Sequence, residues 1–161
     1  MNVPIIRPIL KEDNKQIASL IRNVLLEFGV PKEGTAYADV TLDTMYGAYD
    51  NPRAIYFIIE ENHKIIGGGG ISQLDNYKGN VCELQKMYFL PEARAKGLGK
   101  KMLELCLSKA KEFGFKKCYL ETMPYMKVAQ KLYKKSGFHY IDKSMGNTGH
   151  FSCPVHMLID L

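Results

Sequence analysis

The chain has 161 residues, of which 46% are hydrophobic and 24% charged, and it carries a formal net charge of +5. This length favours a single domain spanning residues 1–161, with enough chain to bury a proper core. No apolar run is long enough to span a bilayer and no secretory signal pattern opens the sequence, so we expect a cytoplasmic protein without a membrane partner.

The first half of the chain shows the patterns of an edge strand, a helix and a hairpin. Two prolines confine the first strand to a sheet edge, because proline cannot donate to a strand ladder. Apolar residues three and four positions apart predict the first helix, which Gly29 can end. In order, we expect a strand over 3–9, a helix over 13–28, a short helix over 39–46, and a strand, turn and return strand over 54–60, 61–64 and 65–71.

Two stretches of this half leave alternatives open. Within the looser segment 30–50, the tyrosine-rich stretch 37–49 either forms a wall of the acceptor cleft or is a hydrophobic covering over the sheet. Four consecutive glycines, 67–70, interrupt the return strand and weaken it. Either a substrate approaches closely there, or a helix crowds against the strand.

The second half alternates strands and helices. We expect strands over 82–90, 117–121, 137–141 and 155–159, helices over 98–113 and 125–136, and a loop over 145–150. Hairpins followed by this alternation predict an α/β fold, with a mixed central β-sheet flanked by helices on both faces.

A strand, a turn and the start of a helix come together over residues 82–101. Pro91 ends the strand, and Gly97 and Gly99 let a ligand approach the backbone. The first N–H groups of a helix lack partners and its dipole is positive there, so the turn favours an anion such as phosphate. Positive side chains surround the same point: Arg94, Lys96, Lys100 and Lys101. The alternative is an ordinary basic helix start, because Gly-x-Gly alone is a weak signal and neither a P-loop nor a Rossmann motif is complete.

Two motifs identify a family resemblance. Arg94-x-x-Gly97-x-Gly99, after a strand that ends in Phe-Leu-Pro, resembles the acyl-CoA-binding motif of the GCN5-related N-acetyltransferase (GNAT) superfamily. The stretch from Ala129 to Phe138, with Leu-Tyr-x-x-x-Gly-Phe, is similar to a second signature of that family. The resemblance covers about 81–140. It implies a GNAT-like fold whose fourth and fifth strands splay apart around the pantetheine arm.

The resemblance also implies the reaction and the cofactor site. Acetyl-CoA would be the co-substrate, and its acetyl group would pass directly to a primary amine of a small molecule or peptide in a ternary complex. The implied contacts are the backbone of Met87, Tyr88 and Phe89, the pyrophosphate loop of Arg94, Ala95, Lys96, Gly97, Leu98, Gly99 and Lys100, and Met126 and Ala129 on the following helix. Met126 stands where the family often has a pantetheine-binding asparagine, so Tyr125 or Lys127 would have to compensate.

Acetyl transfer to an amine needs a base for the ammonium proton and benefits from an acid for the departing thiolate. Glu83 lies in an otherwise apolar strand, where its pKa would rise, and we expect it to be the base. Glu121 is the substitute, and either residue could act through water. Tyr133 matches the family tyrosine that points at the CoA sulfur, and we expect it to be the acid; the alternative is a core tyrosine.

Other features bear on cofactors and partners. His150-x-x-Cys153-x-x-His156 has a spacing compatible with zinc, but no fourth ligand is obvious and we expect no metal. The four cysteines suggest reduced core thiols. The lysines are spread along the chain, which argues against a nucleic-acid partner. A non-catalytic acyl-CoA sensor or scaffold is the alternative function, and a homodimer and the identity of the amine stay open.

Overall fold

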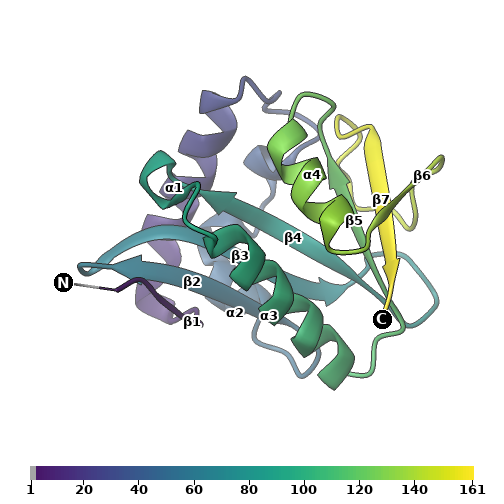
Figure 1. Ribbon diagram of the computed structural model, residues 1–161, viewed down its shortest axis with the longest axis horizontal. Helices are drawn as coiled ribbons and strands as arrows, with labels where there is room; N and C mark the ends of the chain where they lie inside the picture. Colours follow the sequence, from purple (N-terminus) through teal and green to yellow (C-terminus); the bar gives the residue numbers. More distant parts are fainter. Residues whose placement is uncertain (1–2) are drawn as a thin grey trace.

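A seven-stranded mixed sheet with helices on both faces organises residues 3–161, which the computed structural model describes (Figure 1). The strands are β1 Ile5–Pro8, β2 Ile55–Glu61, β3 Lys64–Gln73, β4 Val81–Phe89, β5 Lys117–Thr122, β6 His139–Ile141 and β7 Val155–Asp160. The helices are α1 Asn14–Glu27, α2 Met45–Ala48, α3 Leu98–Glu112 and α4 Lys127–Lys135. This architecture confirms the predicted α/β fold.

The strand order is β1-β2-β3-β4-β5-β7-β6, and β4 and β5 form a parallel pair while the other neighbours are antiparallel. β1 lies at the edge, as its two prolines predict. β4 and β5 pair over Val81–Glu83 and Lys117–Tyr119 and then separate (Figure 1). The expected splay of these strands is therefore present, and it opens a fork in the middle of the sheet.

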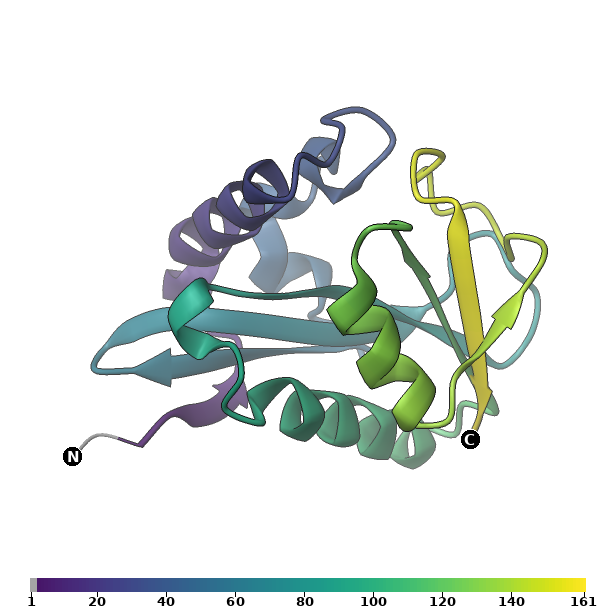
Figure 2. The same cartoon turned by 45° about the horizontal axis from the view of Figure 1, so that its top comes forward.

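Two hydrophobic cores lie on opposite faces of the sheet, as Figure 2 shows for α1 and α3. α1 buries Ile17, Ile21 and Leu25, while α3 buries Met102 and Cys106. These positions repeat every three or four residues, so each helix buries one apolar face. None of the helices in residues 3–161 combines the length and apolar character needed to cross a lipid bilayer.

The prediction of a helix over 39–46 is wrong. A 3-10 turn over Ala36–Ala38 precedes the segment, which itself holds a second 3-10 turn over Leu42–Thr44 and the first two residues of the short helix α2, Met45–Ala48. Asp39 is extended, with φ −61° and ψ 126°. Its side chain bonds to residues distant in sequence, and these contacts override the local helical pattern.

Side chains crowd the glycines of β3, and the nearest ones come from the neighbouring strands: a Cβ at Gly68 would lie 2.6 Å from Tyr56 of β2, and one at Gly69 would lie 3.0 Å from Met87 of β4. A Cβ at Gly68 would lie 3.0 Å from Ile17 of α1, and one at Gly69 would lie 3.2 Å from Met102 of α3. Of the two alternatives for the four glycines, these contacts support close packing of neighbouring elements, with side chains of β2 and β4 nearest and those of α1 and α3 next. The glycines therefore leave room for packed side chains on both faces of β3.

Candidate active site

A β-bulge in β4 determines which side chains face the candidate site. The pairing of β3 with β4 shifts between Gly68 and Gly70, and Lys86 has a positive φ of 50°. The hydroxyl of Tyr56 donates a 2.7 Å hydrogen bond to the Lys86 carbonyl oxygen and holds this backbone in place. As a result Gln85 and Lys86, although adjacent in sequence, both line the same small cavity.

Glu83 is a buried carboxylate at the fork between β4 and β5. It forms the last pair of the two strands, opposite Tyr119, and is 4% exposed. Gln85 donates a 2.7 Å hydrogen bond to its Oε1 atom. Burial, assisted by the negative charge of Glu121, raises the pKa of Glu83 to about 7. A carboxylate with this pKa is partly ionised at neutral pH and can accept a proton from an ammonium group.

Glu121 and His150 meet Glu83 in the same cavity, whose volume is about 40 Å³. One ligand atom from each lies within 4.8 Å of the others, so the three side chains could hold an amino group or a divalent cation. Tyr119 donates a 2.7 Å hydrogen bond to Oε2 of Glu121, and Thr148 donates to Oε1. These bonds hold the Glu121 carboxylate beside that of Glu83.

Asp39 bonds to His150, which lines the cavity, although the two residues belong to loops 111 residues apart in the chain. His150 Nε2 donates a 2.8 Å hydrogen bond to Asp39 Oδ1, and Lys86 Nζ lies 3.0 Å from Oδ2. Burial opposes ionisation of Asp39, but the contacts with His150 and Lys86 outweigh it and lower the Asp39 pKa. Burial likewise opposes charge on His150, and the bond to Asp39 outweighs it and raises the His150 pKa.

Further contacts join the same two loops beside the site. We call these joined loops, around Gly34–Asp39 and His150–Ser152, the roof of the site. The backbone N–H of Ser152 donates a 2.9 Å hydrogen bond to the Gly34 carbonyl oxygen. The ring of Phe151 covers Gly34 so closely that a Cβ there would come within 2.5 Å of it. Gly34 also has a positive φ of 69°, which favours glycine at this contact. The roof therefore depends on backbone geometry as well as on Asp39 and His150.

One tyrosine of segment 30–50 reaches the hydrogen-bond network of the site. Tyr49 donates a 2.6 Å hydrogen bond to Oε1 of Gln85. The ring of Tyr37 instead lies 5.4 Å from the ammonium group of Lys32, and Tyr46 is exposed. Tyr49 thus contributes to the site, as expected for a cleft wall, whereas Tyr37 and Tyr46 lie outside its hydrogen-bond network.

The turn between β4 and α3 presents backbone N–H groups without helical partners. Gly97 is the N-cap of α3 with φ 76°, and the first helical bond returns from Lys101 N to Gly97 O at 3.2 Å. No side chain caps this end. A Cβ at Gly99 would lie 3.2 Å from Leu132, so α4 packs against the start of α3. Such an open helix start could hold a phosphate group.

Arg94 is turned toward α1 and is not free in the turn. Its guanidinium bonds to both oxygens of Glu27, at 2.7 and 2.8 Å, and its Nε donates to the Phe89 carbonyl oxygen at 3.1 Å. Its positive charge is therefore partly compensated, and the side chain ties the turn to the ends of α1 and β4. The other residues predicted for the pyrophosphate loop differ in burial. Leu98 is buried and Gly99 is half-buried, and the exposed ones are Ala95, Lys96, Gly97 and Lys100.

The strand edge at Met87–Phe89 is open toward the fork. β3 pairs with this stretch on one side, whereas β5 pairs with β4 no further than Glu83 within residues 3–161. The side chains of Met87 and Phe89 pack toward the α3 core, while Tyr88 lines the site cavity. The free backbone groups of this edge could bond to an extended, peptide-like ligand.

Tyr133 lies on the inner face of α4 and is 7% exposed. Its ring centre is 5.9 Å from that of Phe138, in an edge-on contact. Burial raises the pKa of Tyr133 above its usual value, so the hydroxyl is protonated at neutral pH. Met126 is the N-cap of α4 and its sulfur accepts a 3.6 Å hydrogen bond from Thr122, while Ala129 packs on the α3-side core. This position is compatible with Tyr133 as the general acid and with Tyr133 as a core residue.

The zinc-like spacing does not gather into one cluster. Cys153 lines the cavity with His150, and burial raises the pKa of its thiol to about 12. His156 lies on β7 with its Nδ1 atom 3.0 Å from the Tyr119 hydroxyl. The ligand-like group in residues 3–161 is Glu83, Glu121 and His150 instead. No motif in the sequence marks the site residues Asp39, Gln85 and Lys86, because tertiary contacts and the β-bulge bring them together.

Comparisons with known proteins agree with this geometry. The model of the acetyltransferase (GNAT) family matches residues 19–138, which include the fork, the turn before α3 and Tyr133. The chain is 44% identical over 159 residues to the uncharacterized N-acetyltransferase YjgM of Escherichia coli K12, covering 98% of this chain and 95% of that relative.

Solved structures share the fold. The acetyltransferase of the GNAT family from Staphylococcus aureus Mu50 superposes with a TM-score of 0.85 at 23% identity, and 99% of each chain is covered. PaiA N-acetyltransferase from Thermoplasma acidophilum, solved in complex with coenzyme A, has a TM-score of 0.74 at 20% identity, again over 99% of each chain.

Proposed function

Because the chain belongs to the acetyltransferase (GNAT) family, we propose that it transfers an acetyl group from acetyl-CoA directly to a primary amine of a small molecule or peptide. The observation that carries this proposal is Glu83, a buried carboxylate with a pKa of about 7 at the fork of the sheet. Such a group is poised to remove the proton of an ammonium near neutral pH. Glu121 lies beside it and adds negative charge that favours a cationic acceptor.

The residues around the fork fit acetyl-CoA, which supplies the acetyl group as a thioester. The open edge at Met87–Phe89 would bond to the pantetheine arm, and a backbone N–H of that edge would stabilise negative charge on the thioester oxygen. The start of α3, with Gly97 and Gly99, would bind the pyrophosphate. Arg94 would shape this turn through Glu27 and Phe89.

Glu83 and Tyr133 carry out the proton transfers from the amine and to the sulfur. Glu83 accepts a proton from the amine, directly or through a water molecule, and Gln85 holds the carboxylate in place. The amine nitrogen then forms a bond to the acetyl carbon as the carbon–sulfur bond breaks. The buried Tyr133 hydroxyl donates its proton to the departing sulfur. The newly bonded nitrogen loses its second proton as it becomes the amide nitrogen, and this proton, carried through water, restores the Tyr133 hydroxyl.

A thiol-release assay tests the proposal. Purified protein and acetyl-CoA are incubated with monoamines, diamines, amino acids and short peptides, and free coenzyme thiol is measured. Release that depends on one of these amines supports the function. Acetyl-CoA binding by calorimetry without release for any amine would overturn catalysis and favour the sensor or scaffold alternative. A parallel assay with a chelator is informative, since Glu83, Glu121 and His150 could also hold a cation.

A further inference from the structure

Two sets of charged side chains line the cavity at the fork. Glu83 and Glu121 form the first set, and within residues 3–161 neither forms an ion pair with a lysine or an arginine. Lys86 and His150 form the second set, but both contact one carboxylate, since Asp39 lies 3.0 Å from the Lys86 ammonium and 2.8 Å from Nε2 of His150. Asp39 is not among the residues that line the cavity. It therefore compensates the two cationic residues, while the negative charge of the two glutamates is left for a ligand.

A carboxylate on a ligand would meet no uncompensated cation in this cavity. The Lys86 side chain is 8% exposed, so water screens its pairing with Asp39 less than it screens an ion pair at the surface. If Lys86 turned to a ligand, Asp39 would lose a partner in a site that holds little water, which costs free energy. When all five groups are ionised, three carboxylates stand against two cations, which gives a net charge of −1. The cavity therefore attracts an ammonium group and disfavours a carboxylate.

The cavity is also small, with a volume of about 40 Å³. Sites that enclose a whole small ligand have volumes of roughly 300–1,000 Å³. The cavity therefore admits the amino group of an acceptor and the carbon that bears it, and little more. Any other group on that carbon, such as the carboxylate of an α-amino acid, must lie beside the charged side chains of the cavity wall.

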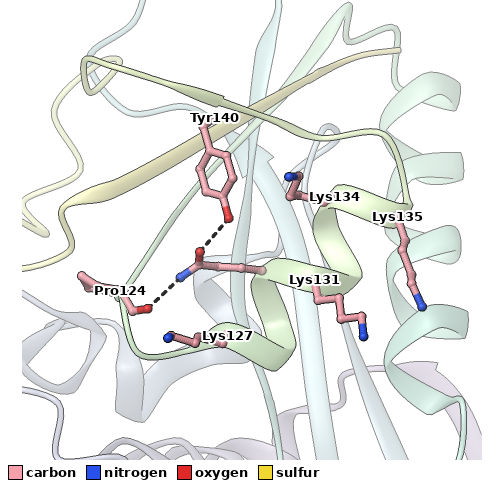
Figure 3. A pocket seen from close by; sticks show the side chains of 7 residues that line it. Pro124, Lys127, Lys131, Lys134, Lys135 and Tyr140 are labelled. Atoms are coloured by element: carbon pink, nitrogen blue, oxygen red, sulfur yellow. Dashed lines mark hydrogen bonds between the residues drawn. The ribbon is translucent and has the colours of Figure 1, made fainter.

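A second and larger hollow of the molecule has the opposite charge. It measures about 460 Å³ and lies on the solvent face of α4 (Figure 3). Four lysines line it, and within residues 3–161 no acidic residue does: Lys127, Lys131, Lys134 and Lys135. Lysine ammonium groups repel a protonated amine, so this hollow is a poor site for the acceptor. The acceptor is instead selected by the charges of the cavity at the fork.

We propose that the acceptor is a primary amine without a carboxylate on the carbon that bears the amino group, and that Asp39 sets this specificity by holding Lys86 and His150. The inference rests on the proposed function and deepens it by naming the class of acceptor. Simple amines, amino acid amides and peptide N-termini belong to this class, and free α-amino acids do not. Asp39 acts through its two partners, so it is a specificity-determining residue and takes no part in the chemical step.

Three acceptors that differ in one substituent test the proposal: 2-phenylethylamine, phenylalanine and phenylalanine amide. Release of the coenzyme thiol from acetyl-CoA gives kcat/KM for each, and ethylamine, alanine and alanine amide form a second series with a small side chain. The amide has nearly the size of the carboxylate but no charge, so the ratio of kcat/KM for the amide to that for the acid reports on charge. The intrinsic reactivity of each amine is the same with every protein, so a change of this ratio between variants isolates the contribution of the protein.

The proteins are the wild type, Asp39→Asn, Lys86→Met and the control Asp43→Asn. Asp43 is an exposed aspartate that pairs with Arg22, so its variant makes the same chemical change away from the cavity. Thermal melts establish that each variant folds. A general loss of rate from a loosened roof leaves the ratio readable, because it affects all acceptors alike.

We expect the wild type to prefer the amide to the acid by about 100-fold, as an unfavourable placement of like charges commonly does. In Asp39→Asn the ratio should fall about tenfold, because Lys86 is released and can pair with the carboxylate of the acid. Lys86→Met should keep or widen the preference, because it removes the cation that could serve the acid. Asp43→Asn should keep the wild-type ratio.

Three outcomes would overturn the proposal. A wild type that uses phenylalanine as well as its amide, with this activity lost in Lys86→Met, would mean that Lys86 leaves Asp39 to bind the carboxylate. An unchanged ratio in Asp39→Asn would show that Asp39 does not set the specificity. Thiol release with other amines but with none of the six test compounds would place the acceptor outside the proposed class. Failure of the proposed function is distinguishable from all three, because no amine of any kind would then release the thiol.

Discussion

Gln85 donates a 2.7 Å hydrogen bond to the buried carboxylate of Glu83, and its own carbonyl oxygen accepts a 2.6 Å hydrogen bond from Tyr49. Tyr49 therefore orients the Gln85 amide, and this amide in turn holds the Glu83 carboxylate in place. These two hydrogen bonds connect segment 30–50 to the fork between β4 and β5. The position of the proposed base therefore depends on a part of the molecule that no sequence motif marks.

Replacing Glu83 by Gln should lower kcat by roughly 100-fold, because the variant has no carboxylate to accept the amine proton. In the wild type, kcat/KM should rise with pH through about 7, since the base must be ionised. Initial rates from pH 5.5 to 9 measure both effects. Glu12→Gln, at an exposed position, is the control. A variant that retains the wild-type rate and pH profile would remove Glu83 from the mechanism and direct attention to Glu121.

Glu83 should also make the stability of the fold depend on pH. Its pKa rises from 4.5 to about 7 on folding, so the folded state holds a proton that the unfolded state releases. The associated stability is complete below pH 4.5 and is lost as the pH rises through 7. This rise of the Glu83 pKa corresponds to a change of about 3 kcal/mol in the free energy of unfolding. Urea unfolding at pH 5 and pH 8 should show this loss in the wild type and a smaller one in Glu83→Gln; equal losses would contradict the prediction.

The regular elements of the fold follow from local patterns in the sequence. α1 and α3 begin and end close to the predicted residues, because their apolar positions repeat with the helical period and glycines follow them. The open start of α3 was likewise predictable, since Gly97 and Gly99 act through local backbone geometry.

The roof of the site was not predictable in this way. Asp39 meets His150 across 111 residues, and Lys86 joins them because a β-bulge turns it into the cavity. Arg94 illustrates the same limit at the turn. Its motif predicts positive charge beside a phosphate, but its partner in the fold is Glu27, which lies 67 residues earlier.

Replacing Tyr133 by Phe should lower kcat by roughly 100-fold and leave the affinity for acetyl-CoA nearly unchanged. Phenylalanine keeps the edge-on contact with Phe138 and removes only the hydroxyl that would protonate the thiolate. Rates and calorimetric titrations of the same preparations separate the two effects. Tyr77→Phe is the control, because Tyr77 is an exposed tyrosine far from α4 in sequence. Unchanged kcat would assign Tyr133 to the core alone.

Replacing Gly99 by Glu should weaken acetyl-CoA binding by roughly 100-fold or more, because it puts a carboxylate where the helix start would bind pyrophosphate. The fold should persist, since the new Cβ would meet the flexible end of Leu132 at 3.2 Å. Gly47→Glu is a matched control, because a Cβ at Gly47 has no neighbour within 4 Å. Normal coenzyme binding by a folded Gly99→Glu variant would refute the phosphate site at α3.

Replacing Asp39 by Asn should lower the pKa of His150. In the wild type, burial opposes the imidazolium but the bond to Asp39 outweighs it, so the pKa lies above the ordinary value of 6.5. In the variant, burial and the positive charge of Lys86 still lower the pKa of His150, and of the groups that raise it only the negative charge of Glu83 remains, so the midpoint should fall. NMR titration of the His150 ring measures this shift.

The same pair should make closure of the roof dependent on pH. Because the folded pKa of His150 is raised, the Asp39–His150 contact contributes its full stability below pH 6.5 and loses it as the pH rises through the folded pKa. Amide exchange of the loop backbone at Ser152 should therefore quicken with pH beyond its intrinsic rate, and Asp39→Asn should be faster already at low pH. Asp43→Asn removes an exposed aspartate that pairs with Arg22 and should leave His150 unchanged. An unaltered His150 midpoint in Asp39→Asn would mean that Glu83 and Glu121, the other carboxylates of the cavity, govern the imidazole instead.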